Sequence, residues 1–163
     1  MKAITLLITI TLGLITSTSH AESQQPLIKT YQTQAQLLLK QLDDKAADNI
    51  ESQSQVLVKL SKTIIQQVNQ NLPQCTEYFT ALSNAADTMA QLTLEEIEAG
   101  YHADGLLPEL KDATCYHAKD LLVHPATVQA MARIGIKTNK EWTQAKHEIE
   151  EVLAHLSAVN SQL

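Results

Sequence analysis

Apolar residues recur every three or four positions along nearly the whole chain, and this helical spacing is the strongest constraint on its fold. Two early stripes show it: Leu27, Tyr31, Ala35, Leu38 and Leu42, and then Ile50, Leu57, Leu60, Ile64, Val68 and Leu72. No run alternates like a strand, and beyond residue 21 glycine occurs only at 100, 105 and 135. We therefore predict an all-α domain, a bundle of about four main helices with an elaborated connection over residues 93–125 and one disulfide.

The two early stripes are not separated by proline or glycine. One helix over residues 27–72 would be about 70 Å long at 1.5 Å per residue, which is long for a small domain. Two helices, or one sharply bent helix, are therefore favoured, and Asp43-Asp44 or Asp48-Asn49 are candidates for capping the second. The sequence does not decide whether residues 27–72 form one helix or two.

Local signals mark the boundaries of the later helices. Pro73 is typical of a helix start, Thr93 with Glu96 and Thr138 with Glu141 have capping-box spacing, and Gly135 is typical of a helix end. Thr114 is a candidate cap for a helix from Cys115. The apolar stripes that follow are Cys75, Phe79, Leu82, Ala86 and Met89, and in the last helix Trp142, Ala145, Ile149, Val152, Leu156 and Val159.

The N-terminal segment has the features of a secretory signal peptide. Lys2 precedes an uncharged apolar run over residues 3–15, and Ser19-His20-Ala21 places small residues where a signal peptidase cleaves. We predict a signal peptide at 1–21, a single helical-bundle domain at 22–163 and a periplasmic or secreted location. The run is too short for a comfortable membrane span, so no span is expected after cleavage.

Charge and cysteine content narrow the function classes further. Loss of Lys2 takes the net charge from −6 to about −7, without a basic face for phosphate, so a nucleic-acid partner is disfavoured. The two cysteines of an exported chain predict a Cys75–Cys115 disulfide. The chain-entropy relation values a loop of this size at about 4 kcal/mol as an upper figure. The alternative is a free Cys115 thiol beside His117, against which an oxidising compartment argues.

The segment 101–125 concentrates the chemistry-bearing side chains of the chain. Gly105 is expected to allow a turn with positive φ, and Leu106-Leu107-Pro108 either caps the bundle or forms a lid over a pocket. On a helix from Cys115, one face carries Cys115, Ala118 and Leu122. The opposite face carries His117, Asp120 and His124, a polar stripe that the core does not explain. Pro125 predicts a kink or break at His124, with a new helix starting at Pro125.

Imidazole and carboxylate groups in this segment are ligand types for zinc, copper or nickel. His117 and His124 lie about 10.5 Å apart along a helix, too far to share one ion. Asp120 can share an ion with either of them, and His102 or Asp104 is the natural source of a third ligand. The candidate metal ligands are therefore His102, His117, Asp120 and His124. A solvated or locally hydrogen-bonded polar face is the competing interpretation.

These observations leave two candidate functions. In the first, the chain is a binding or interaction protein of the envelope, and its partner is a protein or a small ligand. Its predicted surface consists of Tyr101, His102, Asp104, Tyr116, His117, Asp120 and His124. The alternative is a periplasmic metal-binding protein that uses the His/Asp cluster, with zinc or copper as the candidate ion.

Catalysis and haem binding find little support in the sequence. No nucleophile stands beside a base in a recognisable frame, so a binding protein is favoured over an enzyme and no catalytic residue is assigned. The CxxCH motif of c-type haem attachment is absent. A b-type haem held through Met89 or Met131 is the weaker possibility, because methionines at helical spacing usually belong to the core. The specific ligand and the oligomeric state cannot be read from the sequence.

Overall fold

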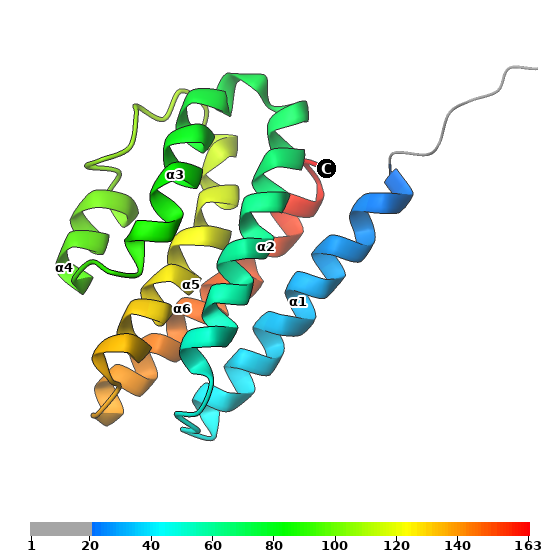
Figure 1. The fold of residues 1–163 in the computed structure, drawn as a ribbon. Coiled ribbons are helices and arrows are strands. Elements are labelled where there is room, and N and C mark those ends of the chain that lie inside the picture. The colour runs from blue at the N-terminus through cyan, green and yellow to red at the C-terminus, as the bar shows by residue number, and fades with distance from the viewer. Residues whose placement is uncertain (1–20) are drawn as a thin grey trace, which may run out of the picture.

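The structure is a computed structural model that describes residues 21–163, and these residues form six α-helices (Figure 1). The helices are α1 (Ala21–Asp43), α2 (Ile50–Asn71), α3 (Thr76–Met89), α4 (Leu94–Ile97), α5 (Tyr116–Ile134) and α6 (Asn139–Asn160). Three single turns complete the order: η1 (Pro73–Cys75), η2 (Glu98–His102) and η3 (Ala113–Cys115). The predicted signal peptide lies outside the described residues apart from Ala21. None of the described helices is both long and apolar enough to cross a membrane.

Four long helices form the bundle predicted from the apolar stripes. Helix α1 packs against α2 and α6, and α5 packs against the same two helices, so α1 and α5 lie diagonally across the core. The short helices α3 and α4 lie against the outer side of α5 (Figure 1). This third layer consists of α3 and the first part of the elaborated connection over residues 93–125, and it makes α5 the central helix of the domain.

The first two stripes belong to separate helices, as favoured from the sequence. Helix α1 ends at Asp43 and α2 begins at Ile50, and the connection contains Lys45 and Asn49 at positive φ, 50° and 68°. Asn49 holds the N-cap position of α2, but its side chain makes no capping hydrogen bond. Most members of the predicted stripes are buried, whereas Leu27, Leu60, Leu72 and Trp142 are partly buried at the edge of the core.

The predicted local signals mostly appear where the sequence places them. Thr93 with Glu96 and Thr138 with Glu141 both form complete capping boxes. Pro73 begins η1, and Gly135 ends α5 with φ 97°. The prediction for Thr114 is wrong, because the Asp112 carboxylate accepts from the Thr114 N–H and caps η3 itself.

Helix α5 is buried on every side, which corrects the interpretation of its polar stripe as solvent-facing. Every residue from Ala118 to Met131 is buried, including Lys119, Asp120 and His124. A helical wheel assumes that one face of a helix meets water. In this domain α2, α3 and α6 surround α5, so charged side chains are enclosed with the apolar ones. The buried charged groups of α5, such as Lys119 and Asp120, therefore need partners on the neighbouring elements.

Pro125 lies inside one continuous helix, so the predicted new helix at Pro125 is wrong. Proline lacks the N–H that would bond the carbonyl four residues earlier, and that carbonyl belongs to Leu121. The Tyr31 hydroxyl of α1 donates to the Leu121 carbonyl at 2.5 Å, and the Ser61 hydroxyl of α2 donates to it as well. Two neighbouring helices thus replace the missing backbone donor, and α5 continues through the proline.

The cysteine pair forms the predicted disulfide, Cys75–Cys115, with a Cα–Cα distance of 5.8 Å. Both cysteines are buried, and no described cysteine is free. The bond joins η1 to η3, so it anchors the far end of the excursion that starts at α4. The first turn of α5 is thereby fixed against the start of α3.

Candidate metal centre around His124

A π-helical turn, η2, places His102 beside α5. The turn follows the capped helix α4 and closes with a bond from the Ala103 N–H to the Glu98 carbonyl at 2.9 Å. The π-turn is rare and is frequent at functional sites. The predicted positive φ of Gly105 is wrong, because Asp104 takes it instead, at 59°. Gly105 is needed for close approach, since a Cβ there would lie 2.4 Å from the Ala99 carbonyl oxygen.

Lys119 ties the residues after this turn to α5. Its buried ammonium donates to the His102 carbonyl at 3.0 Å and to the Asp104 carboxylate at 3.1 Å. The Tyr78 hydroxyl of α3 donates to the same Asp104 carboxylate at 2.7 Å, which raises the pKa of Tyr78 beyond the effect of its burial. Asp104 is therefore committed to an ion pair with Lys119, and His102 is held from its backbone.

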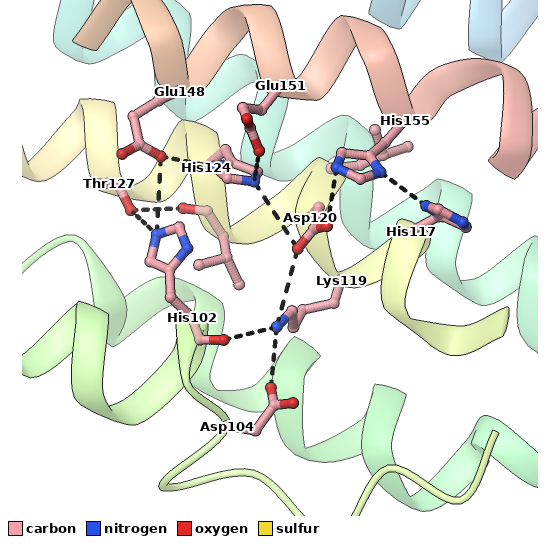
Figure 2. Close-up of polar contacts among 12 residues, drawn as sticks. His102, Asp104, His117, Lys119, Asp120, His124, Thr127, Glu148, Glu151 and His155 are labelled. Carbon is pink, nitrogen blue, oxygen red and sulfur yellow. Dashed lines mark hydrogen bonds and ion pairs between the residues drawn. The ribbon is translucent and has the colours of Figure 1, made fainter. Parts of the chain in front are cut away.

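His124 is the centre of a group of six side chains, the His124 cluster, which also contains His102, Asp120, Glu148, Glu151 and His155. Figure 2 shows these side chains converging on the imidazole of His124 from α5, α6 and η2. On one side of the ring, His124 Nδ1 lies 2.6 Å from Glu148 Oε2. His102 Nε2 lies 3.8 Å from the same Glu148 oxygen and 3.0 Å from the Thr127 hydroxyl.

A second group of ligand atoms faces the other nitrogen of the same ring. His124 Nε2 lies 3.9 Å from Asp120 Oδ1 and 3.8 Å from Glu151 Oε2. His155 Nε2 approaches Asp120 Oδ2 to 3.2 Å. The structure thus contains two triads whose ligand atoms all lie within 4.8 Å of one another: His102, His124 and Glu148, and Asp120, His124 and His155.

Burial favours the neutral forms of three members of the cluster, Asp120, His102 and His155. Desolvation raises the pKa of Asp120, although the positive charges of His124, Lys119 and His155 oppose this shift. Desolvation also lowers the pKa of His102 and of His155, while Glu148 and Asp120 respectively oppose it. Because a lowered pKa keeps imidazole unprotonated at neutral pH, these two rings are in the charge state that binds metal ions.

One oxygen of Asp120 remains unsatisfied in the cluster. The Asp120 side chain is only 2% exposed, and its Oδ2 forms no hydrogen bond. The contact with His155 Nε2 is short enough for a hydrogen bond but does not have the required geometry. Among the six buried side-chain atoms of the described residues that lack a partner, this is the only carboxylate oxygen. A buried carboxylate oxygen without a hydrogen bond is costly, so this oxygen favours a nearby positive charge, either a protonated His155 or a bound cation.

The structure brings together three of the four predicted metal ligands, namely His102, Asp120 and His124. His117 belongs to neither triad, and its Nδ1 contacts His155 Nδ1, on the ring nitrogen opposite to the one that faces Asp120, at 2.8 Å. Of the two pairs that the sequence offered for sharing an ion, Asp120 with His117 and Asp120 with His124, only the second lies within one triad of the described residues. Of the two proposed third ligands, His102 reaches the cluster and Asp104 is held by Lys119.

The predicted interaction surface is mostly enclosed. Tyr101, Asp120 and His124 are buried, and His102, Asp104 and His117 are half-buried, which leaves Tyr116 as its exposed member. In the preceding loop, Leu106 is exposed, whereas Leu107 and Leu110 pack against the core.

Sequence reasoning missed the half of the cluster that α6 contributes. Glu148, Glu151 and His155 each directly precede a core residue of the last helix, Ile149, Val152 and Leu156. This spacing places all three on one flank of the apolar stripe, and it was a usable signal for a second ligand-bearing face. His147 lies elsewhere on α6, with its side chain 67% exposed.

Comparison with known proteins adds no assignment. A scan against protein-family models, a search of curated proteins and a search of solved structures each found no match to this chain.

Proposed function

We propose that this protein binds a divalent transition-metal ion, zinc or copper, in the His124 cluster. The observation that carries the proposal is the pair of overlapping ligand triads on α5, α6 and η2, together with the buried, unpartnered Oδ2 of Asp120. Imidazole nitrogen and carboxylate oxygen are suitable donors for both ions. Sites in helical bundles are commonly built from side chains that facing helices direct inward.

The distances in the cluster are compatible with coordination after small adjustments. Two ligand atoms bound to one tetrahedral ion at about 2.0–2.1 Å are about 3.3 Å apart. The His155–Asp120 contact of 3.2 Å is close to this separation, and the Asp120–His124 and Glu151–His124 contacts of 3.9 and 3.8 Å are slightly longer. The Glu148–His124 contact of 2.6 Å is a hydrogen bond that an ion would widen.

His102 needs a change of tautomer before it can bind an ion through Nε2. The Thr127 hydroxyl donates to the Val123 carbonyl at 3.0 Å, so in the metal-free protein it accepts from His102 Nε2. Moving the proton to Nδ1 frees the Nε2 lone pair for a metal ion. The bond from His102 Nε2 to Thr127 is therefore broken when an ion binds.

Metal binding accounts for the arrangement better than an interaction surface over residues 101–125. A docking surface needs exposed side chains, and only Tyr116 of the predicted set is exposed. The export of the chain to the periplasm or medium remains part of our proposal. The Cys75–Cys115 disulfide is compatible with an oxidising compartment.

Native mass spectrometry of the protein, expressed from its full-length sequence and purified without chelator, tests the proposal. We expect a mass increment of bound zinc or copper. After the metal is stripped, calorimetric titration should show binding that is at least tenfold weaker in His124→Gln, about 1.4 kcal/mol. The matched control is His147→Gln, which removes an exposed histidine of α6 outside both triads. His147 Nε2 lies 3.3 Å from Glu151 Oε1, an exposed contact, so the variant should bind within twofold of the wild type.

If the stripped protein binds zinc and copper no more tightly than His124→Gln, the cluster is not a metal site. Circular dichroism of each variant confirms that the helices are retained, so that a loss of binding is not mistaken for a loss of fold.

A further inference from the structure

The two ligand triads approach His124 through opposite nitrogens of its ring. Glu148 faces Nδ1 at 2.6 Å, whereas Asp120 and Glu151 face Nε2 at 3.9 and 3.8 Å (Figure 2). Each side also has a second imidazole, His102 near Glu148 and His155 near Asp120. An ion placed on one side therefore leaves the ligands of the other side without a cation.

The arrangement of rings supports the separation into two sides. The His102 and His124 centroids are 5.0 Å apart with the ring planes inclined by 63°. The His124 and His155 centroids are 6.3 Å apart, and these two rings are nearly parallel at 12°. The rings of His102 and His155 thus flank His124 as members of different triads, and the structure does not gather all three around one point.

The charges of the cluster balance for two ions. Asp120, Glu148 and Glu151 supply three negative charges, and a doubly deprotonated His124 ring supplies a fourth, which equals the charge of two divalent cations. Lys119 does not disturb this balance, because Asp104 pairs with it at 3.1 Å, although its Nζ also lies 4.0 Å from Asp120. A single divalent ion would leave the cluster with excess negative charge in a largely buried site.

We infer that the His124 cluster is a two-metal centre in which the His124 imidazolate bridges two divalent ions. One ion is bound by His102, Glu148 and Nδ1 of His124, and the other by Asp120, His155 and Nε2 of His124, with Glu151 beside it. This inference rests on the proposed function and specifies its site. When both ions are bound, the ring proton that His124 shares with Glu148 is released to solvent. The ions are then about 6 Å apart, with metal–nitrogen bonds of about 2.0–2.1 Å on both sides of the ring.

Stoichiometry is the first test, with zinc as the probe and native mass spectrometry as the readout. We expect two ions per wild-type chain at saturation. Glu148→Gln should remove one ion and His155→Gln the other, so each variant should retain one. His147→Gln, on the same helix but exposed, should retain two. Thermal unfolding of each metal-free variant checks that the fold is retained.

Magnetic coupling is the second test, with Cu²⁺ as the probe. Two Cu²⁺ ions joined by an imidazolate couple antiferromagnetically. The low-temperature electron paramagnetic resonance signal should therefore rise with the first equivalent and fall with the second, to less than half the intensity of two independent ions. Glu148→Gln, which retains one ion, should show the full signal of a single copper.

The outcomes separate this inference from the proposed function. Absence of any bound ion overturns both. One ion per wild-type chain, with weaker binding in His124→Gln, overturns the bridged centre and leaves the metal-binding function standing. Two zinc ions with two magnetically independent coppers overturn the bridging role of His124. The bridged centre is supported by two zinc ions in the wild type, one zinc ion in Glu148→Gln and in His155→Gln, and a magnetically coupled copper pair in the wild type.

Discussion

Helix α5 carries two groups of buried polar atoms, and they differ in whether the chain itself satisfies them. At the Leu121 carbonyl, the hydroxyls of Tyr31 and Ser61 replace the backbone N–H that Pro125 lacks. On the same helix, Asp120 directly precedes Leu121 and His124 follows it by three residues, and both belong to the His124 cluster, in which a carboxylate oxygen has no hydrogen bond. Asp120 and His124 are buried like Leu121, so burial alone does not explain the difference.

The comparison suggests a way to distinguish structural from functional polar groups in a core. A structural group, such as the Leu121 carbonyl, is complete in the isolated chain and stabilises the fold. A binding group is left incomplete, and its ligand supplies what is missing. The His124 cluster has charged members, an unpartnered oxygen and a rare π-turn nearby, whereas the Leu121 group has none of these.

The largest expected effect concerns the bond that anchors α5 beside both groups. Replacing Cys75 and Cys115 together by serine should lower the free energy of unfolding by about 3 kcal/mol, because the unfolded chain gains the freedom of a long loop. Chemical denaturation of the variant and of the reduced wild type measures this loss. An unchanged midpoint would mean that the connection between α4 and α5 is held by its own packing.

Removing both hydroxyls from the Leu121 carbonyl should have the next largest effect. Tyr31→Phe alone should cost about 1 kcal/mol, because Ser61 still reaches the carbonyl. Adding Ser61→Ala leaves the buried carbonyl without a donor, and the double variant should lose about 3 kcal/mol, more than the sum of the single changes. Zinc affinity should stay within twofold of wild type. A double variant with weakened metal binding would erase the distinction between the two groups.

Asp120→Asn should sharpen the comparison by moving stability and binding in opposite directions. Burial raises the pKa of Asp120, so at neutral pH the ionised group costs free energy that a neutral amide does not. The metal-free variant should be more stable by about 1 kcal/mol, or about 3 °C in Tm, and should bind one ion fewer. Calorimetry of the stripped proteins measures the first effect. A destabilised variant would show that Asp120 serves the fold.

The smallest effect is a pH dependence of the metal-free protein. The pKa of His102 and of His155 is lowered by burial, so the folded state binds fewer protons than the unfolded state below about pH 6.5. Stability is therefore fully present above that pH and is lost as the pH falls toward the folded pKa values. Thermal melts between pH 7.5 and 5 should show this decline in Tm. The decline should be less steep in His102→Gln, and in the exposed control His147→Gln it should equal that of the wild type. The raised pKa of Asp120 has the opposite sign, because the folded state then binds more protons, so the melts are repeated in Asp120→Asn. A Tm of Asp120→Asn that rises on acidification would contradict the shifts of His102 and His155.

Local sequence signals predicted the fold because they act over a few residues. The capping boxes at Thr93 and Thr138 and the helix end at Gly135 depend only on near neighbours, and two cysteines leave one possible pair. Pro125 shows the limit of this reasoning. Its local effect predicts a break or kink, and the compensating hydroxyls of Tyr31 and Ser61 come from helices far away in the chain.

The candidate site was predicted in part for the same reason. The spacing of Asp120 and His124 correctly indicates that their side chains can meet, and the structure also brings His102 to them. The wheel could not show that α6 covers this face, so a solvated or locally hydrogen-bonded face stayed open beside the metal-site interpretation. The ligands on α6, such as Glu148 and His155, become recognisable only when the flank of a second helix is considered together with the first.

The most direct test of the account is the position of the ions in a crystal of the zinc-loaded protein. Anomalous scattering at the zinc edge locates each ion without assumptions about its ligands. The account predicts two peaks, one on each side of the His124 ring and each about 2.0–2.1 Å from one of its nitrogens. Zinc found only at exposed positions such as His147, or no peak at the ring of His124, would contradict it.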